Sequence, residues 1–176
     1  MVKSLSLILK IVFFIIAVIG ITKVTQHQID YFRTIKYNQT PITMVEREKQ
    51  LTCLAKNIYF EAAQEPFEGK VAVAQVTLNR AESGQFPNDV CNVVYQKNVI
   101  YGKVICQFTW YCEGGAVIKS NSLYNESMEV AKKVLLENFR LPSMKSAYYY
   151  HADYVHPNWN LPKIAQIGRH VFYGKK

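Results

Sequence analysis

Two glutamates, Glu61 and Glu65, stand four residues apart near the end of a segment with helical periodicity. On a helical wheel with Leu51 at zero, Glu65 falls about 40° and Glu61 about 80° from the apolar face. A carboxyl group at the edge of such a face is desolvated, which raises its pKa toward the range of a proton donor at neutral pH. Cleavage of a glycosidic bond requires an acid of this kind. The alternative interpretation is that both are ordinary exposed acids at a frayed helix end.

Two groups of aromatic and polar side chains later in the chain could hold a sugar by ring stacking and hydrogen bonds. The first group, after a predicted strand, is Gln107, Thr109 and Trp110, and the second is Tyr149, Tyr150, His151 and Trp159. Alternate residues of a strand face opposite sides, so core packing is an equal alternative for Tyr149 and Tyr150. For His151 and His170 a structural role is favoured over metal ligation.

Three long segments with helical periodicity would position these groups. Residues 45–64 form the first predicted helix, and residues 69–80 form the second, which is apolar at almost every position and should be buried on most sides. The third predicted helix carries Met128, Ala131, Val134, Leu135 and Phe139 and is closed by Pro142. Asp89 can cap a short helix that runs through Tyr95.

Short β-like runs complete the pattern. Residues 99–105 predict two strands around a turn that contains Gly102, and residues 147–151 and 170–173 predict two more. The expected fold is therefore α+β, mostly helical with a small antiparallel sheet.

The N-terminal residues 5–21 are strongly apolar, interrupted only by Ser6, Lys10 and Gly20. This length is near the lower limit for a membrane-spanning helix, so the segment is either an export signal or an anchor. Small residues suited to signal cleavage are poorly placed, which favours an uncleaved anchor. The sequence thus predicts an N-terminal hydrophobic helix in residues 1–22, a polar tether in residues 23–43 and a catalytic domain in residues 44–176. The expected location is the inner membrane, single-pass, with the domain in the periplasm.

The chain has 176 residues, of which 49% are apolar and 19% charged, and this excludes a disordered or fibrous protein. Its net charge of +8 suits a polyanionic wall polymer or an anionic membrane, but no nucleic-acid fold signature accompanies it, so no nucleic-acid partner is expected. Four cysteines, with no C-x-x-C pair, indicate two disulfides in an exported domain rather than a metal site. The three possible pairings of Cys53, Cys91, Cys106 and Cys112 stay open.

Five motifs in order resemble the cell-wall hydrolase family of the spore-cortex-lytic (SleB) type. The first places Tyr59, Glu61, Ala62 and Glu65 in the segment "LTCLAKNIYFEAAQEPFEGKVAVAQVTLNR". The other four are "FPNDVCNVVYQ", "CQFTWYCEG", "YYYHADYVHPNW" and "IGRHVFYG", so the resemblance covers about three quarters of the chain. One position departs from the family pattern, because Gln64 stands where the family usually has glycine.

The resemblance implies a lysozyme-like domain that acts on peptidoglycan glycan strands as a lytic transglycosylase. Such enzymes cleave between N-acetylmuramic acid and N-acetylglucosamine and leave 1,6-anhydro ends. Glu61 would be the catalytic acid, and Glu65 would assist it. Tyr59 joins the two groups named above as a substrate-binding residue. No cofactor is expected, and the enzyme is expected to act as a monomer. Its origin stays open between a bacterial wall-remodelling enzyme and a phage endolysin.

Three alternatives stay open. A hydrolytic muramidase needs a second carboxylate roughly 6.5–9.5 Å from the first, whereas residues one helical turn apart have Cβ atoms about 5–6 Å apart. A zinc amidase could use His151, His156 and His170, although no H-E-x-x-H helix is present. The third alternative is a wall-binding module without activity.

Overall fold

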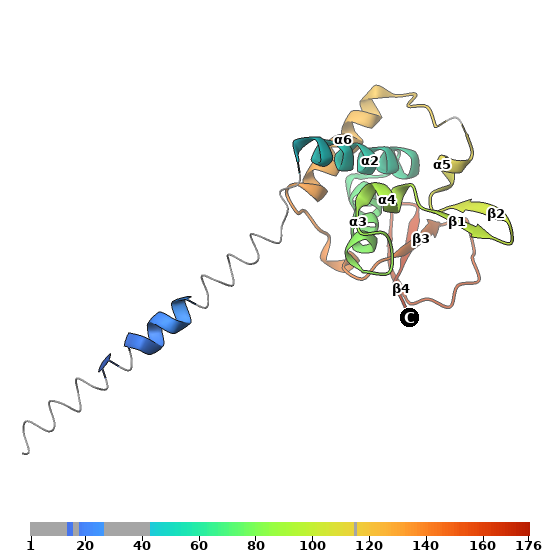
Figure 1. Ribbon diagram of the computed structural model, residues 1–176. Helices are drawn as coiled ribbons and strands as arrows, with labels where there is room; N and C mark the ends of the chain where they lie inside the picture. The colour runs from blue at the N-terminus through green and yellow to red at the C-terminus, as the bar shows by residue number, and fades with distance from the viewer. Residues whose placement is uncertain (1–13, 16–17, 27–42, 115) are drawn as a thin grey trace, which may run out of the picture. The chain divides into compact units, whose positions relative to one another are not determined.

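The computed structural model describes residues 14–15, 18–26, 43–114 and 116–176 (Figure 1). The chain divides into two units, Met1–Thr43 and Met44–Lys176. In the first unit, residues 18–26 are helical. All elements named below belong to the second unit.

The expected membrane anchor and tether lie largely outside the described residues. Within the described residues, no helix is long and apolar enough to span a membrane. The predicted single-pass inner-membrane location is therefore contradicted.

The described part of the second unit contains four main helices. They are α2 (Met44–Ala62), α3 (Phe67–Glu82), the short α4 (Val90–Val94) and α6 (Asn121–Leu135). Helix α3 is central, since α2, α4 and α6 all contact it, and every residue from Gly69 to Arg80 is buried (Figure 1). The first two helices match their predicted spans within two residues at each end.

Helix α6 ends at Leu135, earlier than its apolar pattern suggested. Asn138 adopts a positive φ of 55°, a left-handed conformation that asparagine tolerates better than most residues and that interrupts a helix. Helix α4 has its predicted cap, because the Asp89 side chain accepts a hydrogen bond from the Asn92 backbone N–H.

Strands β1 (Lys97–Ile100) and β2 (Lys103–Cys106) form the predicted antiparallel hairpin. Tyr101 and Gly102 both have positive φ, 49° and 75°, as a tight hairpin turn with matching twist requires. A short helix, α5 (Thr109–Cys112), follows.

A three-stranded antiparallel sheet has the order β3-β5-β4, and its strands are Tyr149–Ala152, His170–Tyr173 and Lys163–Ile167. The 3-10 turn η1 (Pro142–Met144) leads into it. The sequence predicted β3 and β5 but missed β4. Two of its five residues are exposed Lys163 and Gln166, and its register shifts between Lys163 and Ala165, so it has no clean alternation.

The apolar core has two parts that meet at α3. Val71, Ala74 and Leu78 pack with α2, α4 and α6. Other α3 residues, Val73 and Val76 among them, pack against Phe172 of β5 and Met144 of η1. Helix α3 is buried from Gly69 to Arg80 because helices cover it on one side and the sheet covers it on the other.

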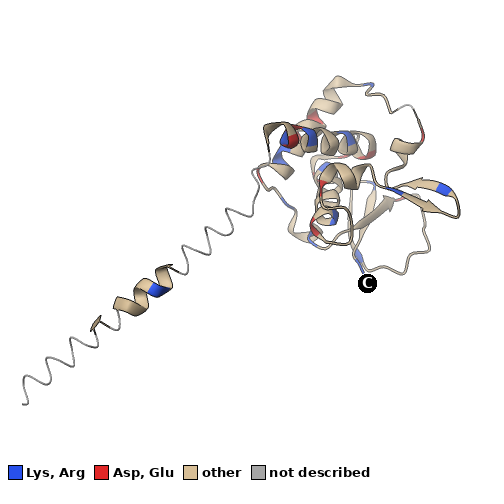
Figure 2. Cartoon of the chain, viewed as in Figure 1, with Lys and Arg blue, Asp and Glu red and all other residues tan. Residues whose placement is uncertain are grey.

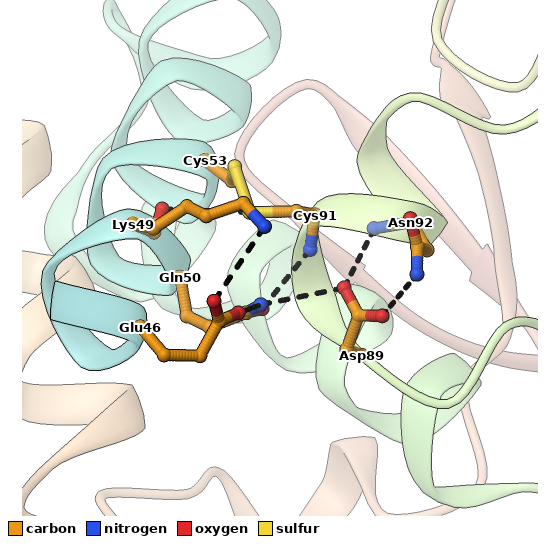
Figure 3. The surroundings of a disulfide bond; sticks show 7 residues. All are labelled: Glu46, Lys49, Gln50, Cys53, Asp89, Cys91 and Asn92. Atoms are coloured by element: carbon orange, nitrogen blue, oxygen red, sulfur yellow. Dashed lines mark hydrogen bonds and ion pairs between the residues drawn. A yellow bond between two sulfur atoms is a disulfide. The ribbon is translucent and has the colours of Figure 1, made fainter. Parts of the chain in front are cut away.

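Two disulfides form, Cys53–Cys91 and Cys106–Cys112, so none of the four cysteines is free. Figure 3 shows the first bond joining α2 to α4, with Gln50 beside it. The Gln50 side chain accepts a hydrogen bond from Cys91 N at 3.1 Å and donates one to Asp89 Oδ1 at 3.4 Å. The second bond closes the loop from β2 to α5.

Charged side chains are scattered over the second unit. Figure 2 shows lysines and arginines on several helices, on the β1–β2 hairpin and at the C-terminus, interspersed with acids. The ribbon shows no single basic stripe along the described part of this unit.

Candidate active site

A cleft of about 490 Å³ opens where α2 ends. Its lining comes from residues 59–65, from Trp110 of α5 with the loop that follows, and from Lys119 and Leu123 at the start of α6. We call it the Glu61 cleft.

Glu61 occupies the last turn of α2 and is half-buried in this cleft. Its Oε2 accepts a hydrogen bond from the Tyr150 hydroxyl at 3.0 Å. Burial raises the pKa of Glu61 above its ordinary value, and the negative charge of Glu113 adds to this. The Tyr150 hydrogen bond and the positive charge of Arg80 act in the opposite direction but do not cancel the rise. The result is a carboxyl group that holds its proton at higher pH than a solvated glutamate does.

Tyr150 reaches Glu61 because the end of α3 anchors the segment that leads into β3. Asn79 donates two hydrogen bonds, to Met144 O at 2.9 Å and to Ala147 O at 2.8 Å. Arg80 Nε donates to Tyr148 O at 2.8 Å, two residues before Tyr150. Burial and the charge of Glu61 raise the pKa of Tyr150 well above its ordinary value, so Tyr150 stays a neutral donor.

Arg80 is a site residue that sequence reasoning missed. It is 3% exposed, and its guanidinium lies over the rings of Phe86, Phe108 and Tyr149 at 5.3, 5.5 and 5.8 Å from their centroids. Burial lowers the pKa of Arg80 from its ordinary value. The available signal was the polar pair Asn79 and Arg80 at the end of a predicted helix that is mostly apolar.

The walls of the cleft are held by hydrogen bonds from neighbouring elements. The Tyr59 hydroxyl accepts from Lys119 N at 2.9 Å and from Ser120 N at 3.1 Å, which fixes the start of α6 against α2. Trp110 stacks on Phe60 with centroids 4.6 Å apart and donates from Nε1 to Asn57 Oδ1 at 3.2 Å. The fully buried Asn57 and the ring of Phe60 were not identified from the sequence.

Glu65 does not continue the helix, because the chain turns after Ala62. Its side chain is 11% exposed, and Oε2 accepts from Arg169 N at 3.0 Å. Oε1 lies 3.8 Å from His170 Nδ1, which has no hydrogen-bond partner among the described residues. The carboxylate thus ties this turn to the β4–β5 hairpin. The helical spacing assumed between Glu61 and Glu65 is not the observed geometry.

Two glycines allow this approach. Gly168 has a φ of 56°, and a Cβ there would overlap Glu65 Oε2. A Cβ on Gly69 would lie 2.9 Å from the Cβ of Glu65. By contrast, Gln64 has no positive φ, so the turn after Glu61 does not need the glycine that is usual at that position.

The second predicted aromatic group is split between the two faces of β3. Tyr150 points to Glu61, whereas Tyr149 and His151 pack against Trp159 with centroids 6.3 and 5.5 Å away. His151 Nε2 is 3.0 Å from the Tyr173 hydroxyl on this second face. None of Tyr149, His151 and Trp159 lines the Glu61 cleft.

The first predicted group is also divided. Trp110 lines the cleft, but Gln107 and Thr109 do not. The Gln107 backbone N–H donates to Gln96 O at 2.9 Å, and this bond extends the hairpin toward α5.

In the described part of the chain, no three His, Cys, Asp or Glu residues are grouped so that they could bind a zinc ion. His151 is bonded to Ala152 O and Tyr173, and His170 faces Glu65 and Tyr150. The zinc amidase alternative therefore has no support in this geometry.

The domain is mostly helical with a small sheet, and one desolvated glutamate, Glu61, lies in an open cleft. A carboxyl group in this position is suited to act as the proton donor of a glycosidase. Residues 64–173 match the family model described as Cell Wall Hydrolase, and the chain belongs to this family. The matched range begins three residues after Glu61. The family resemblance predicted from the five motifs is confirmed.

Curated relatives carry the name spore cortex-lytic enzyme. The Bacillus subtilis (strain 168) protein is 34% identical over 123 residues, which is 68% of this chain and 35% of the relative. The Oceanobacillus iheyensis protein is 32% identical over 129 residues, 71% of this chain and 41% of the relative. The chain thus spans less than half the length of the curated relatives it matches.

Two solved structures are similar. One is the catalytic domain of the germination-specific lytic transglycosylase SleB from Bacillus anthracis, with a TM-score of 0.54 and 29% identity over 70% of this chain and 93% of that one. The other is the catalytic domain of the Bacillus cereus SleB protein, with a TM-score of 0.52 and 27% identity over 72% and 90%. The mixed helical and antiparallel fold is therefore shared with these catalytic domains.

Proposed function

We propose that residues 44–176 are a catalytic domain that acts on peptidoglycan. It cleaves the β-1,4 bond between N-acetylmuramic acid and N-acetylglucosamine as a lytic transglycosylase, leaving a 1,6-anhydro end. The family match and the names of the relatives support the substrate class. The observation that carries the proposal is Glu61, a carboxyl with a raised pKa that lines an open cleft.

In this mechanism Glu61 acts twice. It donates its proton to the glycosidic oxygen while the bond from C1 of muramic acid to that oxygen breaks. The 6-hydroxyl of the same muramic acid then bonds to C1, and its proton returns to Glu61. No water is consumed, so a single carboxyl suffices. Since Tyr150 occupies Oε2, Oε1 is the oxygen that carries the transferred proton.

Glu65 is a positioning residue in this proposal. Its carboxylate contacts Arg169 N and His170, which are both part of the fold. These contacts favour a structural role for Glu65 over a role as nucleophile or base. The ring of His170 packs edge-on against Tyr150 with centroids 5.2 Å apart. Glu65 therefore supports the strand segment from which Tyr150 orients Glu61.

Substrate contacts are assigned by the cleft lining. Tyr59 and Trp110 border the cleft and offer aromatic surfaces to sugar rings. The other residues predicted to bind substrate lie outside the lining, and they are Gln107, Thr109, Tyr149, Tyr150, His151 and Trp159. For them a supporting role is favoured.

A hydrolytic muramidase is the second candidate, because Glu113 also lines the cleft and its charge acts on Glu61. An exposed carboxylate there could activate water on the opposite side of the sugar. Product chemistry separates the two candidates, since hydrolysis leaves reducing muramic ends.

Mass spectrometry of digested peptidoglycan tests the proposal. Wild-type digests should contain 1,6-anhydro muropeptides with few new reducing ends. Glu61→Gln should lose activity by about 10²–10⁴-fold, the usual worth of a positioned proton-transfer group. Glu48→Gln removes an exposed carboxyl from the same helix and should keep full activity. Reducing muramic ends would support the muramidase, and free stem peptides with intact glycan would overturn the glycosidase proposal.

A further inference from the structure

One of the two disulfides lies directly beside the Glu61 cleft. It joins Cys106, the last residue of β2, to Cys112, the last residue of α5. Trp110, inside the loop that this bond closes, lines the cleft, and so does Glu113, the residue after the bond. The described residues of the β1–β2 hairpin all lie outside the lining. The bond therefore ties one wall of the cleft to a hairpin that is not part of that wall.

Helix α5 has little stability of its own. It is a single turn of four residues, and its N-cap residue Phe108 makes no side-chain capping hydrogen bond. Its backbone bonds include those from Tyr111 N to Phe108 O at 3.2 Å and from Glu113 N to Thr109 O at 3.1 Å. Helices much shorter than about 12 residues are unstable in water without tertiary contacts. The position of α5 therefore depends on its side-chain contacts and on the disulfide.

These contacts hold the wall at three places. In the middle of α5, Trp110 stacks on Phe60 of α2. Beyond α5, the Tyr59 hydroxyl accepts a hydrogen bond from Lys119 N, near the start of α6. Between these two places, Cys112 is the covalent anchor at the C-terminal end of α5. Without the bond, this end of the single turn is free to unwind, and the Trp110 ring loses its fixed position on Phe60.

The two disulfides differ in how easily a reductant reaches them. Cys112 is exposed, whereas Cys53 and Cys91 are each only 5% exposed. Thiol–disulfide exchange requires access to the sulfur that is attacked. The Cys106–Cys112 bond also joins residues only 6 apart in sequence, so it restricts the unfolded chain less than the other bond does. Reduction of the bond beside the cleft should therefore precede that of the other bond and leave the domain folded.

We propose that the Cys106–Cys112 disulfide is a redox latch that positions Trp110 for glycan binding, and that a dithiol reductant opens it. This inference rests on the proposed function, because Trp110 meets a glycan only if the Glu61 cleft binds one. The latch acts on substrate binding rather than on proton transfer, since Glu61 is oriented by Tyr150 from β3 and not by α5.

The exchange is a two-electron reduction of the chain. A thiolate of the dithiol bonds to Cys112 Sγ, the Sγ–Sγ bond breaks, and Cys106 leaves as a thiolate that takes up a proton. The second thiol of the reductant then displaces Cys112 from the mixed disulfide. The reductant is oxidised to its own disulfide, its two thiol protons pass to the cysteines, and the chain holds two new thiols.

Variants with one disulfide each test the latch kinetically. Cys106→Ala/Cys112→Ala should raise KM on soluble glycan strands about tenfold, the worth of one aromatic contact. Its kcat should change less than about twofold, and dithiothreitol should have no effect on it. Cys53→Ala/Cys91→Ala should keep the wild-type KM until dithiothreitol raises it to the latch-free value. Wild type in dithiothreitol, sampled when two thiols have appeared, should show the same rise and lose it on reoxidation with oxidised glutathione.

The fluorescence of Trp110 tests the latch without any activity. Trp110 and Trp159 are the two tryptophans of the chain, so Trp159→Phe leaves Trp110 as the one indole reporter. Its emission should shift to longer wavelength as dithiothreitol releases two thiols, and Cys106→Ala/Cys112→Ala in this background should show the shifted emission from the start.

Four outcomes would overturn the latch. They are an unchanged KM in Cys106→Ala/Cys112→Ala, a fall in kcat with KM unchanged, four thiols that appear together, and a Trp110 emission that does not respond to reduction. Absence of glycan cleavage by the oxidised wild type would instead overturn the proposed function, and the fluorescence of Trp110 would then decide whether the bond positions this wall.

Discussion

The hydroxyl of Tyr150 donates a hydrogen bond to Glu61 Oε2 across 89 positions of sequence. It links the last turn of α2 to β3, and both ends depend on α3, which packs under α2 and anchors the start of β3 through Arg80. The bond favours the ionised form of Glu61, whereas burial favours the neutral form and has the larger effect. The pKa of the proposed acid is therefore set by two opposing contributions that can be separated by substitution.

Tyr150→Phe should move the alkaline limb of the kcat/KM profile to higher pH. The substitution removes a hydrogen bond that lowers the pKa of Glu61, so that pKa rises further. Glu61 then keeps its proton to higher pH, and activity as an acid persists there. The maximal rate should fall about tenfold, because the carboxyl is less well oriented. Tyr149→Phe, on the other face of β3, should leave the limb in place. A limb that shifts to lower pH, or equally in both variants, would contradict the assignment.

Glu61→Gln should be more stable than wild type at neutral pH. Because the pKa of Glu61 is raised in the folded state, folding favours the protonated form. The unfolding free energy of wild type then declines as pH rises from the ordinary glutamate pKa through the raised folded value. Glutamine does not titrate, so the Tm advantage of the variant should grow across this window and vanish below it. Each 1 kcal/mol that the variant gains in unfolding free energy should raise its Tm by roughly 2–4 °C.

Glu48→Gln controls for the loss of one carboxyl, and Tm is measured for the three proteins from pH 3 to pH 8. An advantage for Glu61→Gln that is the same at all pH values would show that the burial of Glu61 does not govern its protonation.

Gly168→Ala should destabilise the domain more than Gly84→Ala does. Both glycines have positive φ, 56° and 70°, so both substitutions carry backbone strain of about 1–3 kcal/mol. Only at Gly168 does the added Cβ also overlap Glu65 Oε2, while at Gly84 nothing lies within 4 Å. Urea unfolding of both variants measures the difference.

Combining Gly168→Ala with Glu65→Ala isolates the overlap. If the overlap with Glu65 is the cause, the double variant should be less destabilised than the two single changes together. Additive losses would show that Glu65 and the β4–β5 hairpin are not coupled.

The sequence predicted what depends on local periodicity. The long runs of α2 and α3 and the cap at Asp89 follow from side-chain spacing, and so does the position of Glu61 near the apolar face. It did not predict contacts that arise only when distant segments meet, such as Arg80 anchoring β3 or Glu65 reaching Arg169. Strand β4 was not predicted, because its register with β5 shifts and its residues therefore show no regular alternation. The anchor expected in residues 5–21 lies largely outside the described residues, and among the described residues no helix is long and apolar enough to span a membrane.

Removing the Cys53–Cys91 bond should cost more stability than removing Cys106–Cys112. A disulfide restricts the unfolded chain, and the restriction grows with the length of the loop it closes. The sequence separations are 38 and 6 residues, which correspond to about 4 and about 2 kcal/mol in the chain-entropy model. The first bond also holds α4 against α2 beside Gln50, whereas the second closes a local loop. Cys53→Ala/Cys91→Ala and Cys106→Ala/Cys112→Ala should therefore differ in urea midpoint, with the first lower. Thiol titration of denatured, unreduced wild type should find no free thiol, and equal midpoints for the two double variants would contradict the loop-length argument.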